Sequence, residues 1–288
     1  MADPPDDITF NAIVMAESLS GVDRKTGELL RDYINSIEHA PARATLITVE
    51  SRAAFLGLLH DLESQAREYG LLPVLHVEAH GNAGSGIWFA DDSCLSWEDF
   101  CDRITPLNEA TGMRLLVTVA ACYGSSLISG VRLSKPAPCF ALVGATEAID
   151  EPEVIGAFRD FYGAMLRTLA AGPAVAALKR HSLRRGGLDV ITARLWFELL
   201  MTKYLREELT PRKLKESALR LYHKARTEPG QIRNVGDYKR LIRRELPGIV
   251  RRYFETFFMI SDPTTHPRYR SMWARLEAHI EVFRRSRP

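Results

Sequence analysis

A histidine and a cysteine each follow an apolar run, and these are the residue types best suited to chemistry in this sequence. His80 follows residues 72–79 (LPVLHVEA), and Cys122 follows residues 114–121 (RLLVTVAA). Apolar runs of this length are typical of buried parallel strands, and functional groups gather where such strands end. Neighbouring strands lie about 4.8 Å apart, so two adjacent strand ends would present an imidazole beside a thiol.

An imidazole beside a thiol is the arrangement that makes cysteine a nucleophile. A free thiol has a pKa of about 8.5 and is little ionised at neutral pH, and a neighbouring imidazole raises the ionised fraction. We expect His80 to take the proton of Cys122 and to return it to a leaving amine. Gly81 has no Cβ, so its N–H and that of Cys122 are the expected oxyanion donors. A structural histidine and an inert buried thiol are the alternative interpretation of each residue taken alone.

The pattern of the first half of the chain predicts an α/β fold. Strands are expected at residues 10–16, 44–49, 72–79, 114–121 and 138–145, and amphipathic helices at residues 27–37, 53–69 and 153–171. Strands and helices in alternation imply right-handed crossovers and a mainly parallel sheet with helices on both faces. After about residue 180 the strand pattern ends, and the rest of the chain predicts helices only.

Charge divides the chain into two parts. Residues 1–178 carry 12 Lys and Arg against 24 Asp and Glu, whereas residues 179–288 carry 26 against 12. We therefore expect two domains, one of residues 1–178 and a basic helical domain of residues 179–288, with the segment KRHSLRR at residues 179–185 as the seam between them. The basic part is expected to dock on the acidic part, to meet an acidic partner, or simply to form a solvated helical surface.

Composition argues against several classes of protein. The chain has 288 residues, its acidic N-terminus is unlike a secretory signal, and no apolar stretch approaches the length of a membrane span, so we expect a cytoplasmic protein. Cys94, Cys101, Cys122 and Cys139 form no C-x-x-C pair, which favours reduced thiols and no structural zinc. His76 and His80 would lie about 13 Å apart on a strand, too far to share an ion. We expect neither a metal nor another cofactor.

Three segments together resemble a known family. They are HVEAHGN at residues 76–82, VTVAACYGSS at residues 117–126, and ALVGATEAIDEPEVIGAFRDFYGAML at residues 141–166. Their order, and the 42 residues that separate the histidine from the cysteine, resemble the caspase-like cysteine peptidases of clan CD, most closely their bacterial CHAT branch. The resemblance covers roughly residues 8–175. It implies a three-layer α/β/α sandwich in which His80 and Cys122 are the catalytic dyad.

Two departures from the family limit what the resemblance implies. Relatives that cleave after basic residues often have an acidic residue two positions before the cysteine, where this chain has Ala120. Residues 123–138 are too short a connection for maturation by internal cleavage, so we expect activation by a partner or by conformational release. Glu147, Asp150 and Glu151 follow the last predicted strand, where they are expected either to bind a basic peptide or to cap the next helix.

The predicted function is that of a cysteine endopeptidase acting on a protein substrate. The resemblance implies regulated proteolysis in bacterial defence or cell death, with a substrate encoded by a neighbouring gene, for example a gasdermin-type pore former. A catalytically inactive caspase fold that serves as an interaction module is the main alternative. A nucleic-acid-binding effector is a second alternative, less favoured because the basic residues form no recognisable reader motif.

Overall fold

The computed structural model describes residues 8–21, 23–181, 186–207, 210–225, 234–260 and 269–285. The chain forms two compact units. The first, called here the sheet unit, comprises Pro5–Val131 and Pro136–Ala193. The second, called the helical unit, is formed mainly by Arg194–Pro288.

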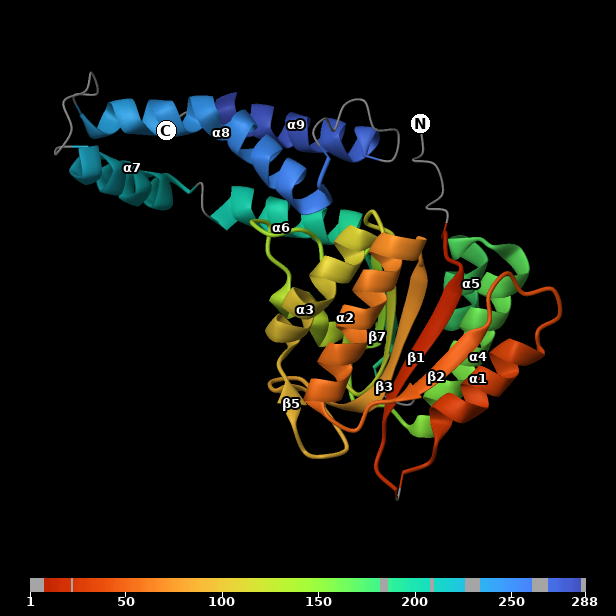
Figure 1. The fold of residues 1–288 in the computed structure, drawn as a ribbon. Helices are drawn as coiled ribbons and strands as arrows, with labels where there is room; N and C mark the ends of the chain where they lie inside the picture. The colour runs from red at the N-terminus through yellow and green to blue at the C-terminus, as the bar shows by residue number, and fades with distance from the viewer. Residues whose placement is uncertain are drawn as a thin grey trace. The chain divides into compact units, whose positions relative to one another are not determined.

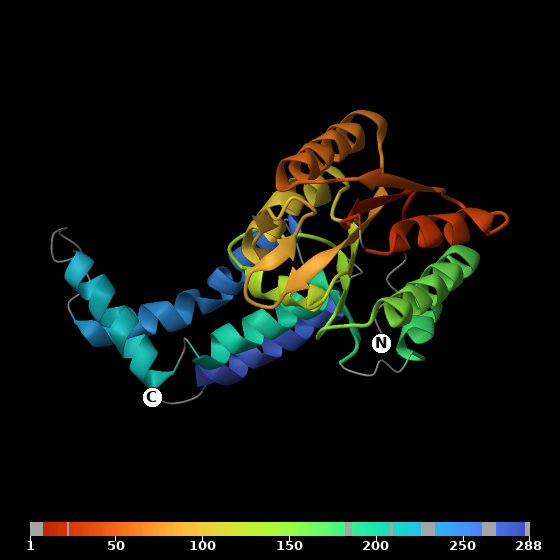
Figure 2. The same cartoon turned by 90° about the horizontal axis from the view of Figure 1, so that it is seen from below.

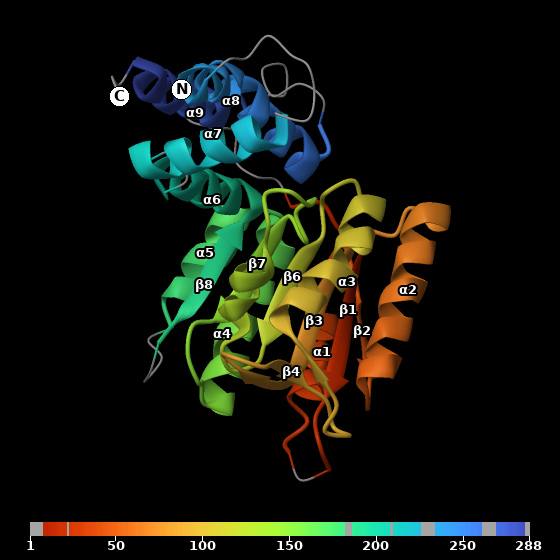
Figure 3. The same cartoon turned by 90° about the vertical axis from the view of Figure 1, so that its left-hand side faces the viewer.

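The sheet unit is built on a sheet with the strand order β2-β1-β3-β6-β7-β8 (Figures 1 and 3). Strands β2, β1, β3, β6 and β7 are parallel to one another, and β8 runs antiparallel to β7. A short antiparallel extension, formed by β4 and β5, pairs with the end of β3. The strands are β1 (Ala12–Ser18), β2 (Ala44–Thr48), β3 (Pro73–Asn82), β4 (Gly86–Trp88), β5 (Cys94–Leu95), β6 (Leu116–Ala120), β7 (Ala141–Ala145) and β8 (Leu188–Thr192).

Helices cover both faces of this sheet, which confirms the predicted α/β fold with a mainly parallel sheet. One face carries α1 (Thr26–Ser36), α4 (Glu151–Thr168) and α5 (Ala171–Lys179), and the other carries α2 (Arg52–Tyr69) and α3 (Trp97–Ala110), as Figures 1 and 2 show. Each helix lies in a connection between strands, as expected for crossovers that pack helices against a parallel sheet. The sheet unit therefore has three layers.

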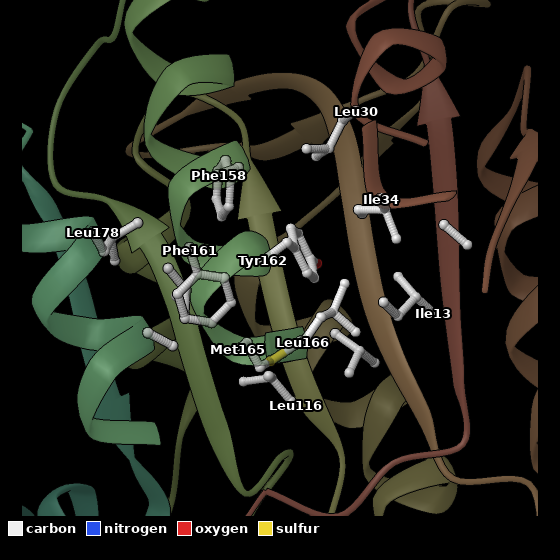
Figure 4. Close-up of a cluster of buried hydrophobic side chains, with 14 of the residues drawn as sticks. Ile13, Leu30, Ile34, Leu116, Phe158, Phe161, Tyr162, Met165, Leu166 and Leu178 are labelled. Atoms are coloured by element: carbon white, nitrogen blue, oxygen red, sulfur yellow. The ribbon is translucent and has the colours of Figure 1, made fainter. Parts of the chain in front are cut away.

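Aromatic side chains of α4 fill the core on one face of the sheet. Figure 4 shows Phe158, Phe161 and Tyr162 facing Ile13 of β1 and Leu30 of α1. All five are at most 2% exposed, and burying an apolar side chain of this size contributes about 1.5–3 kcal/mol. This packing holds α1 and α4 against the strand ends that carry the predicted site.

The sheet unit extends further along the chain than the predicted domain of residues 1–178. The sequence pattern after residue 180 predicts no strand, and this prediction is wrong because β8 pairs with β7 from Ala141↔Thr192 to Ala145↔Leu188. The sheet unit accordingly ends at Ala193. Of the predicted seam at residues 179–185, residues 182–185 lie outside the described part of the chain.

The helical unit contains α6 (Ala193–Glu207), α7 (Pro211–Ala225), α8 (Val235–Phe258) and α9 (Arg270–Arg285), as Figure 3 shows. Its core is aromatic, with Phe254 of α8 against Trp273 of α9 at a centroid distance of 5.3 Å. Arg275 donates two hydrogen bonds to the carboxylate of Glu198, at 3.0 and 3.1 Å, and so joins α9 to α6. Across the described residues, no helix combines the length and apolar character that a membrane crossing requires.

Candidate active site

The register between β3 and β6 brings the two predicted catalytic positions together. His76 is paired with Thr118, and Glu78 is paired with Ala120. The ladder ends at this pair, so His80 and Cys122 each lie two residues beyond the last paired positions of two neighbouring strands. Because side chains alternate between the two faces of a strand, His80 of β3 lies on the same face as His76 and Glu78.

Gly81 allows the ends of the two strands to approach closely. A Cβ placed on Gly81 would lie 2.1 Å from the carbonyl oxygen of Cys122 and 3.1 Å from the Cβ of Ala121. No other residue type fits between these backbones. The two amides predicted as oxyanion donors, those of Gly81 and Cys122, therefore belong to backbone segments in direct contact.

His80 and Cys122 also line one pocket of about 140 Å³. Its apolar wall includes Leu19, Ile149 and Val154, from the loop after β1, the loop after β7 and the first turns of α4. The pocket thus lies at the carboxyl ends of β1, β3, β6 and β7, where parallel sheets form their functional sites.

Asp23 holds the imidazole of His80. The side chain of His80 is 65% exposed, so packing alone cannot orient it. Its Nε2 lies 3.2 Å from Oδ2 of Asp23, and the same oxygen accepts hydrogen bonds from the backbone N–H and the hydroxyl of Ser20, at 2.8 and 2.7 Å. The Ser20 hydroxyl first, and then His80, lower the pKa of Asp23, so the carboxylate is charged at neutral pH. A charged carboxylate only accepts hydrogen bonds, which assigns the proton to Nε2 and leaves Nδ1 as the basic nitrogen.

Asp23 was missed by the sequence reasoning, although the rule that found His80 and Cys122 applies to it. Asp23 lies in the loop that follows β1, and β1 is the neighbour of β3. The sequence itself does not say that the strand at residues 12–18 lies beside the strand that ends in His80. Only the strand order brings the loop after β1 to the histidine.

The chain turns sharply after Cys122, which is half-buried. Tyr123 has φ 59° and ψ 24°, a left-handed conformation that is uncommon for a residue with a side chain. Its N–H donates to the carbonyl of Glu147 at 3.1 Å, and the N–H of Gly124 donates to the carbonyl of Ala121 at 3.1 Å. The 3₁₀ helix η1 (Gly124–Gly130) follows directly. This hydrogen-bonded turn keeps the thiol at the pocket. Backbone conformations of this uncommon kind are frequent in functional sites.

The structure separates the three predicted substrate-binding residues. Glu151 lines the pocket, and its carboxylate lies 3.5 Å from the guanidinium of Arg24, which lines the same pocket. Glu147 has an exposed side chain and contributes its carbonyl to the turn at Tyr123. Asp150 occupies the N-cap position of α4. Of the three, Glu151 is the one brought to the pocket of His80 and Cys122.

The other cysteines occupy environments that disfavour a thiolate. Burial raises the pKa of Cys139 well above its usual value, and it also raises the pKa of Cys94, whose Sγ lies 3.1 Å from the carbonyl of Ser85. Cys101 is buried against η1. Since thiolates are the reactive form of cysteine, Cys122 is the thiol placed best for chemistry.

Within the described ranges, no group of three or more His, Cys, Asp or Glu side chains has an arrangement that could hold a metal ion. His76, which was considered as a ligand partner of His80, is instead fully buried and hydrogen-bonded to Thr118 and Glu78. A scan against models of known protein families finds no match to this sequence, and a search of curated proteins finds none either.

Proposed function

We propose that this protein is a cysteine endopeptidase in which Cys122 is the nucleophile and His80 the general base and acid. The observation that carries the proposal is the shared pocket of His80 and Cys122, at the ends of the adjacent strands β3 and β6. The hydrogen bond between His80 and Asp23 supports it, because it orients the imidazole and selects the tautomer that can accept a proton at Nδ1.

The reaction follows from these positions. Sγ of Cys122 attacks the carbonyl carbon of a peptide bond, and its proton passes to Nδ1 of His80. The amides of Gly81 and Cys122 stabilise the resulting oxyanion, and the His80 imidazolium then protonates the departing amine. The acyl group stays on Cys122 as a thioester. Water, deprotonated by His80, hydrolyses this thioester and restores the thiol.

The biological setting is proposed from the resemblance of the sequence to the caspase-like peptidases, and the architecture of the sheet unit agrees with it. That family suggests a bacterial, cytoplasmic enzyme of regulated proteolysis in defence or cell death, with an activating partner. A protein encoded nearby, for example a gasdermin-type pore former, is the proposed kind of substrate. This step is an analogy of fold and motif.

Covalent labelling tests the proposed activity. The full chain is treated with a pool of peptidyl acyloxymethyl ketones that differ in the residue next to the reactive group. Labelling is followed in the tryptic peptide of residues 115–132, which contains Cys122 as its sole cysteine. We expect Cys122 to react about a hundredfold faster than Cys94, because His80 can take the proton of Cys122 whereas the pKa of Cys94 is raised.

Denatured protein is the control, and it should lose the preference for Cys122. Equal labelling of Cys94 and Cys122 in the folded chain, or no labelling of Cys122 by any member of the pool, would contradict the proposal. Either result would favour the non-catalytic interaction module.

A further inference from the structure

A row of polar side chains is buried directly behind the pocket, between the sheet and the helices α1 and α4. Glu17 of β1 and Glu78 of β3 are paired in register and are 2% and 3% exposed. His76, Thr118 and Tyr162 are fully buried beside them, and Figure 4 shows Tyr162 of α4 facing the sheet. Buried carboxylates are costly unless they are hydrogen-bonded, so their partners are informative.

The two carboxylates hold the first turn of α1, where Glu17 accepts from a backbone N–H and Glu78 from a side-chain hydroxyl. The N–H of Gly27 donates to Oε1 of Glu17 at 3.0 Å, and the hydroxyl of Thr26 donates to Oε2 of Glu78. Lys25 occupies the N-cap position and offers no side-chain cap of its own. A Cβ on Gly27 would lie 2.9 Å from Oε1 of Glu17, so a side chain at this position would have to displace that carboxylate. The helix is therefore fastened to the sheet by acceptors from two strands.

The remaining partners complete a consistent chain of hydrogen bonds. Oε1 of Glu78 lies 3.0 Å from Nε2 of His76, and Nδ1 of His76 lies 2.6 Å from the hydroxyl of Thr118. The Thr118 hydroxyl lies 2.9 Å from that of Tyr162. With the proton of His76 on Nε2, Tyr162 donates to Thr118, Thr118 to His76, and His76 to Glu78. Thr26 donates to the second oxygen of Glu78.

The loop that carries Asp23 connects β1, which supplies Glu17, to the first turn of α1. It begins after Ser18 at the end of β1 and ends at Thr26, where α1 starts. Nζ of Lys25 donates to the carbonyl of Leu19 at 2.7 Å across the base of the loop. The position of Asp23 thus depends on how firmly the first turn of α1 is held against the sheet.

We propose that Glu17 and Glu78 are positioning residues that act on His80 through this loop. This inference rests on the proposed function. Apolar side chains of similar volume often stabilise a fold as much as a buried polar network does. Stability alone therefore does not account for two paired carboxylates at this place. Their effect is to fix the start of α1, and with it the carboxylate that orients the imidazole.

The test is the pH dependence of alkylation of Cys122 by iodoacetamide in the full chain, followed in the peptide of residues 115–132. In the unchanged protein we expect the inflection to lie at lower pH than in the His80→Ala variant, because the imidazole takes the proton of the thiol. Glu17→Leu and Thr26→Val should each move this inflection upward and lower the rate at pH 6.5 about tenfold, because His80 is less well held.

Two matched variants separate positioning from general destabilisation. Glu17→Gln keeps an oxygen that accepts from Gly27 and should retain the inflection of the unchanged protein. Tyr162→Phe removes a buried hydroxyl at the far end of the same chain, whose partners are Thr118 and His76 of the sheet, and should also retain it. Urea unfolding of each variant shows that the population measured is folded.

The outcomes are distinguishable. An early inflection that survives both Glu17→Leu and Thr26→Val would overturn the positioning role and leave the dyad intact. An upward shift in Tyr162→Phe equal to that in Glu17→Leu would also overturn it, because it would indicate a general effect on stability. A profile in the unchanged protein equal to that of the His80→Ala variant would overturn the proposed function itself.

Discussion

Replacing His80 with alanine is expected to lower the rate constant for reaction of Cys122 with a peptidyl acyloxymethyl ketone about a thousandfold at pH 7, the range of a lost general base. The reason is that His80 and Cys122 line the same pocket at the ends of two neighbouring strands. Without the imidazole, the half-buried Cys122 has no neighbouring base to take its proton. The measurement is the time course of labelling in the peptide of residues 115–132.

Substitutions at Asp23 should give smaller, graded losses. Asp23→Ala removes the acceptor that holds Nε2 of His80 and should slow labelling about a hundredfold. Asp23→Asn retains an oxygen for Ser20 and His80 but no charge, and should lie between the alanine variant and the unchanged protein. The pKa of Asp23 is lowered, so its carboxylate is ionised at every pH above the ordinary value of about 4. Its charged hydrogen bond to His80 is lost only as the pH falls through the lowered pKa.

His60→Ala is the control for the histidine substitution. His60 is exposed on α2, on the other face of the sheet, and its loss should leave labelling unchanged. An unchanged rate in His80→Ala would contradict the assignment of His80 as the base. An unchanged rate in Asp23→Ala would show that this carboxylate does not hold the imidazole during the reaction.

Adding one methyl group at Gly81 should have an effect of similar size. The new Cβ would lie 2.1 Å from the Cys122 carbonyl, far inside van der Waals contact, and the obstacle is backbone that no side-chain rotation can move. The ends of β3 and β6 must therefore separate. We expect labelling of Cys122 to fall at least about a hundredfold as oxyanion donors are displaced. Urea unfolding should show a loss of about 1–3 kcal/mol from overpacking.

Gly84→Ala is the matched control, because it makes the same change three residues along the chain. A Cβ there would meet just one atom within 4 Å, Oδ1 of Asn82, at an ordinary contact distance of 3.7 Å. This variant should label at the rate of the unchanged protein. If Gly81→Ala labels as fast as Gly84→Ala, then close contact between the two strand ends is not required for the reactivity of Cys122.

Much of the sheet could be predicted because its strands are continuous apolar runs. The predicted strands at residues 44–49, 72–79 and 114–121 overlap β2, β3 and β6 closely. β8 escaped prediction because it is a five-residue edge strand with none of its residues fully buried, so its pattern is weak. Edge strands pair on one side and need fewer apolar residues.

The candidate site was predictable only where it follows from strand ends. His80 and Cys122 each follow an apolar run, so the sequence points to them directly. Asp23, and the pairing of Glu17 with Glu78, depend on β1 lying next to β3, and strand order is not encoded in any local pattern. The sequence does contain one local sign of Glu17 and Glu78, because each is a lone carboxylate near the end of an apolar strand. Such residues are rarely buried without a partner.

The central claim is most directly tested by a crystal structure of the full chain after reaction with a peptidyl acyloxymethyl ketone. We predict a thioether on Sγ of Cys122, the His80 imidazole within about 4 Å of that sulfur, and the carbonyl oxygen of the adduct facing the amides of Gly81 and Cys122. An adduct on a different cysteine, or a modified Cys122 with the His80 ring turned to the opposite side of the strand ends, would contradict the claim.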